Sequence, residues 1–90
     1  MEEDELVTLA KLGIDAEAFA MSPLGKFLIK KAESEMESAT QDLISADPDD
    51  IKVNTEMRNR IHVARMFLSW LSDSITIGRS AHDQLEAMNE

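Results

Sequence analysis

The sequence lacks cysteine altogether, and this absence removes two common ways of stabilising a small protein. Without cysteine the chain forms no disulfide bond and no thiolate zinc site, and nothing in it requires an oxidising compartment. The chain has 90 residues, which is one domain at most and close to the size at which a single hydrophobic core is only marginally sufficient. We therefore expect association between chains to supply part of the stability.

A long apolar run is also missing. The most apolar window lies within residues 64–78, spans about twelve residues and contains Asp73, which makes it too short to cross a bilayer. The first ten residues, MEEDELVTLA, are acidic where a secretory signal would be basic. These features predict a cytoplasmic protein with no membrane partner.

Positive charge is scarce, and the shortage is confined to one half of the chain. The net charge is −9, from 18 acidic and nine basic side chains, and residues 1–50 carry the whole excess. Lys26, Lys30 and Lys31 form the only compact basic group, which is typical of a solvated helix face. Because so acidic a surface repels a phosphate backbone, we expect no direct binding of nucleic acid.

Proline and glycine are rare, and they occur where helices are predicted to begin or end. Acidic residues crowd the first turn of a predicted helix at about residues 3–12, and Gly13 follows where a helix C-terminus favours a left-handed residue. Asp15 can cap a further short turn through Phe19 and Met21.

Both prolines follow a good capping residue. In the pairs Ser22-Pro23 and Asp47-Pro48, the first residue is a favoured N-cap and the proline occupies the first helical position, where its missing N–H costs nothing. We therefore predict a helix start at each pair, with these four residues as structural caps.

Together these signals predict an all-α fold in a single domain, residues 1–90. We expect an antiparallel helical hairpin with an additional short N-terminal helix, similar to a three-helix bundle and oligomeric. The predicted segments are a short helix and connector at 1–21, a helix at 22–46, a turn at 47–50, and a long helix at 50–89 that can break near Gly78.

The predicted long helix has a broad apolar face. Its seam alternates steps of four and three residues through Met57, Ile61, Ala64, Leu68, Leu71, Ile75, Gly78, His82 and Leu85. A second row beside the seam contains Val63, Phe67, Trp70, Ser74, Ile77, Ala81, Gln84 and Met88, and it widens the mostly apolar arc to about 160°. One antiparallel neighbour covers only the narrow seam, so an arc this broad predicts a second neighbour.

The helix at 22–46 reaches back along the long helix only to about Leu71. Residues 72–90 must then pack on the first twenty residues, bend back at Gly78, or project towards another chain. We predict Leu68 and Leu71 to be core residues, and we propose an intermolecular interface formed by Phe67, Trp70, Ile77 and Met88. The alternative is that these side chains are covered within the monomer by Leu6, Leu9, Leu12, Ile14, Phe19 and Met21.

Residues with catalytic or metal-binding chemistry are few. His62 has no carboxylate or histidine at helical metal-site spacing, and the pair of His82 with Glu86 is common on surface helices. The DPDD segment lacks the glycine, the oxygen spacing and the closing glutamate of a calcium loop. No phosphate loop and no nucleophile elbow are present. We expect no enzyme activity, no metal, no cofactor and no small-molecule substrate.

The order of three segments, SPLGKFLIKKAESE, LISADPDDIKV and RIHVARMFLSWLSDSI, resembles a group of short helical-hairpin proteins encoded by tailed bacteriophages. Members share a Ser-Pro-Leu-Gly helix start, a Glu-rich helix, an Asp-Pro turn and a second helix with a Trp-Leu pair. The resemblance covers residues 22–78. It implies a phage gene product without known catalytic residues, in which the matching positions are structural markers only: Ser22, Pro23, Asp47, Pro48, Trp70 and Leu71.

Two functions remain open from the sequence. In the first, the chain is a non-enzymatic accessory protein that self-associates or docks on a larger phage or host protein, either in the host cytoplasm or in the virion. In the second, the acidic half imitates nucleic acid and inhibits a host nucleic-acid-binding protein. The acids that would replace phosphates are Glu2, Glu3, Asp4, Glu5, Glu33, Glu35, Glu37 and Asp42.

Overall fold

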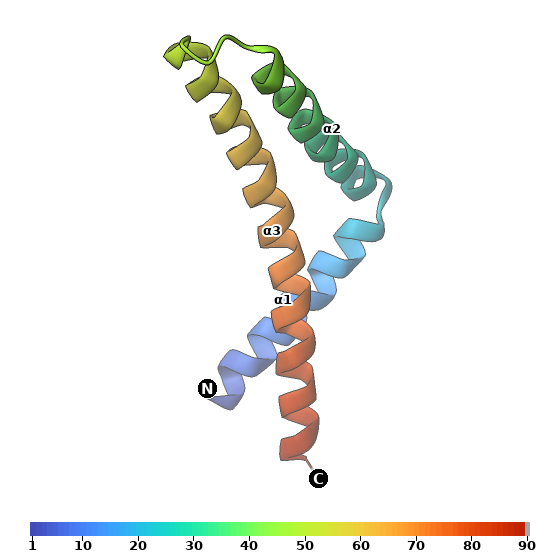
Figure 1. The fold of residues 1–90 in the computed structure, drawn as a ribbon. Helices are drawn as coiled ribbons and strands as arrows, with labels where there is room; N and C mark the ends of the chain where they lie inside the picture. Colours follow the sequence, from blue (N-terminus) through green and yellow to red (C-terminus); the bar gives the residue numbers. More distant parts are fainter. Residues whose placement is uncertain (90) are drawn as a thin grey trace. The chain divides into compact units, whose positions relative to one another are not determined.

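The computed structural model describes residues 1–89 and is built from three α-helices (Figure 1). Helix α1 spans Glu3–Met21, α2 spans Pro23–Ser45 and α3 spans Ile51–Met88. The predicted all-α fold with a long final helix is therefore confirmed. Among the described residues, no helix is both long enough and apolar enough to cross a membrane.

The helices pair in two compact units instead of sharing one core. The terminal unit contains Met1–Lys26 and Trp70–Glu90, and so combines α1 with the C-terminal half of α3. The hairpin unit contains Phe27–Ser69, and so combines most of α2 with the N-terminal half of α3. Of the three alternatives for residues 72–90, the structure shows packing on the first twenty residues.

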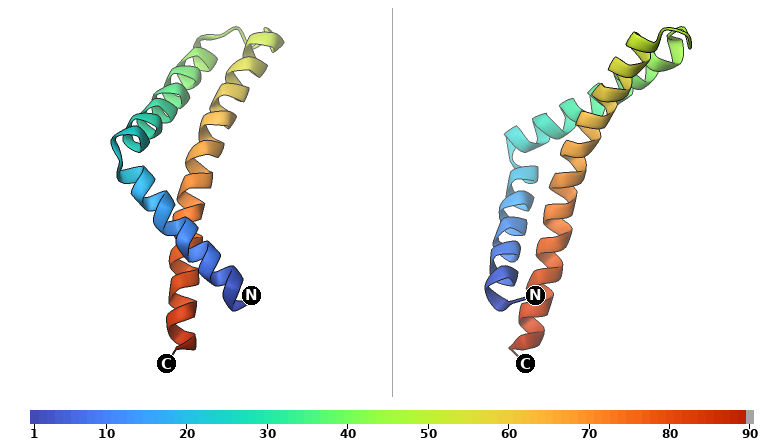
Figure 2. Two further views of the ribbon diagram at one scale, coloured as in Figure 1. Left: turned by 180° about the vertical axis from the view of Figure 1, so that it is seen from behind. Right: turned by 90° about the vertical axis from the view of Figure 1, so that its left-hand side faces the viewer.

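In the terminal unit, α1 crosses the C-terminal half of α3 (Figure 1), and the right-hand view of Figure 2 shows the two helices side by side. Leu6, Ala10 and Ala81 are buried between them, and Leu9 and Leu85 pack against this cluster. Two of the three buried side chains are alanines, and their small size allows the helices to come close.

The closest point of this crossing is formed by two buried glycines, Gly13 and Gly78. A Cβ atom added to Gly78 would lie 2.5 Å from the Gly13 Cα and 3.0 Å from the Leu9 carbonyl oxygen. These neighbours are backbone atoms, which cannot move aside without separating the helices. Each glycine is therefore required by close approach of the two backbones.

The sequence-based boundary at Gly13 was wrong, since α1 runs through it and continues as a 19-residue helix. No described residue has a positive φ, so Gly13 does not act as a left-handed helix cap. Likewise, α3 does not break at Gly78. The sequence predicted a helix end at Gly13 and allowed a break at Gly78, whereas in the structure both glycines allow two continuous helices to touch.

Ser22 connects α1 to α2 through hydrogen bonds to both helices. Its backbone N–H and its Oγ both donate to the Phe19 carbonyl oxygen, at 3.0 and 2.6 Å, and its Oγ accepts from the Gly25 N–H at 3.0 Å. Pro23 follows as the first residue of α2, as expected. A Cβ atom on Gly25 would overlap the Phe19 carbonyl oxygen, which explains a glycine in the first turn of a helix.

In the hairpin unit, α2 and the first half of α3 run antiparallel on either side of a tight turn (Figure 1). The buried side chains of this unit are Ala32, Ala39, Met57 and Ala64. The predicted antiparallel hairpin is therefore present, and its core consists mainly of alanine.

The start of α3 lies three residues later than the Asp47-Pro48 pair predicts. The Asp47 Oδ1 accepts from the Asp49 N–H at 2.9 Å, and the Asp47 carbonyl oxygen accepts from the Asp50 N–H at 3.0 Å, so this segment forms a turn. The cap of α3 is Asp50, whose Oδ1 accepts from the Val53 N–H at 3.2 Å. Asp47 stabilises the turn, and Asp50, the last aspartate of the DPDD segment, caps α3.

We expect Gly78→Ala to destabilise the protein. The added methyl group gains about 1 kcal/mol of helix propensity, but overpacking against the backbone of α1 costs about 1–3 kcal/mol. Urea unfolding measured by circular dichroism checks this, with Ser80→Ala on the exposed surface of the same helix as the control. A Gly78→Ala variant more stable than the wild type would show that the two backbones can separate at little cost.

We expect Ser22→Ala to lower the free energy of unfolding by about 1 kcal/mol, because the N-cap acceptor for the Gly25 N–H is lost. The matched control is Ser34→Ala, since Ser34 is exposed in the middle of α2. Thermal and urea unfolding of both variants check the difference. Equal stabilities of the two variants would mean that solvent replaces the Ser22 hydroxyl without loss.

Candidate protein-interaction surface

The buried core of this protein is small in volume, because it consists mainly of alanine. Of the described residues, seven apolar side chains are buried, five of which are alanine. Within residues 1–89, no large side chain is fully buried. Helix pairs held together in this way leave most of their large apolar side chains at the surface.

These exposed side chains come from all three helices and from the chain start. They are Met1, Leu12, Ile14, Met21, Leu24, Phe27, Ile44, Ile51, Val63, Trp70, Ile77 and Met88. A single exposed leucine or isoleucine is ordinary, but several large apolar side chains on one helix face are typical of an interaction site.

Three of the four predicted interface residues are exposed. Trp70 is 64% exposed, Ile77 is 49% exposed and Met88 is 56% exposed, while Phe67 is half-buried. Their spacings of three, seven and eleven residues place all four on one face of α3. We refer to these four residues as the apolar stripe.

Three of the six N-terminal residues that could have covered the stripe are themselves exposed. Leu6 and Leu9 pack near Ala81 and Leu85, whereas Leu12, Ile14 and Met21 are themselves exposed and Phe19 is half-buried. Leu68 and Leu71, which were expected in the core, are also half-buried. Trp70 is therefore not sealed by α1.

A groove runs between α2 and α3 within the hairpin unit. Its volume is about 810 Å³. The buried side chains of Ala32 and Ala64 form its floor, and Val63, which is 69% exposed, projects from one wall. The complete lining is Leu28, Lys31, Ala32, Glu35, Lys52, Thr55, Glu56, Asn59, Arg60, Val63, Ala64 and Phe67. Phe67 belongs to both the groove and the apolar stripe.

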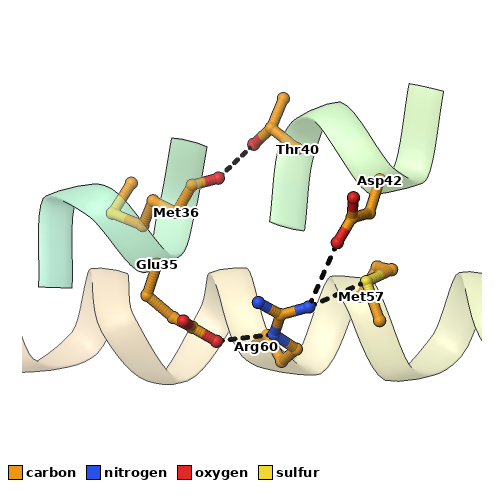
Figure 3. Close-up of polar contacts among 6 residues, drawn as sticks. All are labelled: Glu35, Met36, Thr40, Asp42, Met57 and Arg60. Carbon is orange, nitrogen blue, oxygen red and sulfur yellow. Dashed lines mark hydrogen bonds and ion pairs between the residues drawn. The ribbon is translucent and has the colours of Figure 1, made fainter. Parts of the chain in front are cut away.

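Arg60 links the two helices at the rim of this groove (Figure 3). Its Nε donates to the Glu35 Oε1 at 2.5 Å, and its Nη1 lies 3.5 Å from the Asp42 Oδ2 and 3.2 Å from the Met57 Sδ. The hydrogen bond from Arg60 lowers the pKa of Glu35, and the charges of Arg60 and Lys31 add to this effect while desolvation opposes it. The same bond raises the pKa of Arg60. These contacts hold α2 and α3 in register.

Part of the acidic half is engaged in ion pairs within the chain. Two of its eight proposed phosphate substitutes, Glu35 and Asp42, are paired with Arg60. Glu2, Glu3, Asp4 and Glu5 belong to the terminal unit, and Glu33 and Glu37 belong to the hairpin unit.

Near the C-terminus, three side chains could approach a common metal ion. Ligand atoms of His82, Asp83 and Glu86 lie within 4.8 Å of one another, and the His82 Nδ1 is 3.7 Å from the Glu86 Oε1. All three are exposed on one turn of α3. Exposed clusters of this kind are common without a metal, so this one does not by itself make a metal site.

Sequence reasoning identified the apolar stripe but not the groove. Val63 was placed beside the seam of the long helix and was not assigned to an interface. The available signal was the small size of Ala32 and Ala64 at facing seam positions. Two alanines in contact leave space around them that larger seam residues would fill.

The lowered pKa of Glu35 makes part of the stability dependent on pH. A carboxyl with a lower pKa in the folded than in the unfolded chain stabilises the fold above its ordinary pKa of 4.5, and this contribution is lost as the pH falls through the folded pKa. We therefore expect Glu35→Gln to be less stable than the wild type at pH 7, with a difference that shrinks below pH 4.5.

Urea titrations at several pH values measure this difference. The control is Glu37→Gln, because Glu37 is exposed on the same helix and forms no ion pair within the described residues. A stability difference for Glu35→Gln that stays constant down to acid pH would show that packing, and not charge, holds this contact.

No protein-family model matches the chain, and neither the curated proteins nor the solved structures include a significant match to it.

Proposed function

We propose that this protein is a non-enzymatic helical assembly module that binds another protein through the apolar stripe of α3. The observation that carries this proposal is the 64% exposure of Trp70 in a chain whose buried side chains are mainly alanine. The largest apolar side chain of the molecule contributes little to the stability of the isolated chain. Its placement at the surface is explained by a partner that covers it.

The energetics support an intermolecular role for the stripe. Burying one large apolar side chain contributes about 1.5–3 kcal/mol, so covering Trp70, Ile77 and Met88 together can supply several kcal/mol to an association. Tryptophan is also among the residues most enriched at interface positions that dominate binding. The small internal core gives the chain a reason to form such contacts, since little other burial is available to it.

The partner is a second copy of this chain or a larger phage or host protein. The resemblance of residues 22–78 to short phage proteins supports a viral accessory role, in the host cytoplasm or in the virion. The alternative role as a nucleic-acid mimic is less well supported, because Arg60 engages two of the proposed phosphate substitutes, Glu35 and Asp42.

We expect Trp70→Ala to abolish this association while largely preserving the helical fold, because the indole is mostly exposed in the chain itself. Sedimentation velocity and circular dichroism measure assembly and folding in parallel. Phe27→Ala is the matched control, since Phe27 is an exposed aromatic residue on α2 outside the stripe.

The result that would overturn the proposal is a Trp70→Ala variant that unfolds with no separate change in assembly, since Trp70 would then be a core residue.

The sedimentation measurement is repeated at low and moderate salt. Association through the apolar stripe should change little with salt, whereas binding through an acidic mimic surface should collapse.

A further inference from the structure

We infer that the groove of the hairpin unit receives the hairpin of a second copy of this chain, so that two hairpins form an antiparallel four-helix bundle. This inference rests on the proposed function and names the partner and the contact surface. It is carried by the shape of the groove, by the balance of charge around it, and by the order of charges along α2.

The shape of the groove favours another helical hairpin as its occupant. Both walls are helices, and the floor is formed by the small side chains of Ala32 and Ala64. In a helical hairpin, each helix covers only one side of the other, so a face formed by both helices stays open. A second hairpin is the usual way to cover that face. Val63 and Phe67 are large apolar side chains on the wall that α3 contributes, so a second copy brings side chains suited to fill the groove.

The charge around the groove differs from that of the molecule as a whole. The chain carries a net charge of −9, so two copies repel each other over most of their surface. The groove, however, is lined by both cations and anions: Lys31, Lys52, Arg60, Glu35 and Glu56. A nearly balanced rim is what a self-association surface on an acidic protein requires. A strongly basic partner would instead be expected on an acidic surface.

The order of charges along α2 is self-complementary. Lys31 and Glu35 lie four residues apart on the same wall of the groove. In a two-fold symmetric pair, residue i of one copy contacts residue j of the other and the reverse contact forms as well. When two α2 helices meet antiparallel, each Lys31 therefore lies beside Glu35 of the second copy, and two equivalent ion pairs form.

The same symmetry places an apolar contact on the two-fold axis. The Arg60–Glu35 ion pair marks one level of the hairpin. The two-fold axis passes the midpoint between Lys31 and Glu35, which lies two residues, or about 3 Å, beyond Glu35 on the side away from the turn. Glu35 is level with Arg60, so the same distance along α3 from Arg60 leads to about Val63. Val63 is 69% exposed, so each Val63 can meet its counterpart across the axis.

The first experiment measures mass by sedimentation equilibrium for the full chain and four variants. We expect the wild type to form a dimer of the 10.1 kDa chain, and Val63→Lys and Lys31→Glu to weaken dimerisation at least tenfold. The controls are Ile44→Lys, at a 79% exposed apolar position outside the groove, and Lys30→Glu, at an exposed lysine outside it. Both controls should remain dimeric, and circular dichroism should show helices in all five proteins.

The second experiment tests the axis itself. Because the chain has no cysteine, Val63→Cys introduces a single thiol, and oxidation of the dilute protein should link most chains into a disulfide dimer. Ile44→Cys is the control, and it should link slowly and incompletely. Equal rates of linkage for the two variants would overturn the proposed axis, and so would absence of linkage at position 63.

The outcomes separate this inference from the proposed function. A wild type that stays monomeric overturns the inference that a second copy occupies the groove. This holds also if the chain's own α1 covers the groove. A dimer that resists Val63→Lys but dissociates with Trp70→Ala also overturns the inference, while the apolar stripe remains the interface. A monomer that binds a different protein only when Trp70 is present likewise leaves the proposed function standing and removes the inference. Resistance of the dimer to all of these substitutions overturns both.

Discussion

Close contact between helices through small side chains is the constraint on which the rest of this structure depends. Gly13 meets Gly78 in the terminal unit, and Ala32, Ala39 and Ala64 fill the hairpin unit. Small residues allow helices to approach closely, but they bury little apolar area, and burial of apolar area is the main source of stability. Close packing of this kind therefore leaves large apolar side chains outside, and these become available for contacts with a partner.

Much of the fold could be predicted from the sequence because local signals and the apolar pattern agreed. Ser22 and Pro23 were placed correctly at the start of α2, since a capping hydroxyl before a proline has few other interpretations. Gly13 was misread because a glycine after an acidic helix start suits either a helix end or a close crossing. Only the position of Gly78 in space distinguishes these two roles, and that position is a tertiary fact. The shift of the α3 cap from Asp47 to Asp50 has a similar cause, since three aspartates in four residues compete for one role.

The candidate site was predictable in part. The length of α3 beyond the reach of α2 indicated a second neighbour, and the structure provides it, with α2 along the first half of α3 and α1 along the second. Trp70 was placed beside the seam, and in the structure it is 64% exposed. The groove was not predicted, because a row of alanines along a helix is typical of ordinary close packing between helices and does not by itself indicate a groove. Whether such a contact closes or leaves a hollow depends on side chains on the flanks, such as Leu28 and Val63.

The Arg60 contacts connect stability to the proposed association. Arg60 bonds to Glu35 and approaches Asp42, both on α2, and so holds the two walls of the groove at a set register. A groove that is already formed needs little ordering when a partner enters, and a lower ordering cost leaves more of the contact energy for affinity. The pair also neutralises a carboxylate at the one rim where two acidic chains would have to meet. In the proposed dimer, the same ion pair would stabilise each hairpin and lower the repulsion between the two hairpins of a chain with twice as many acids as bases.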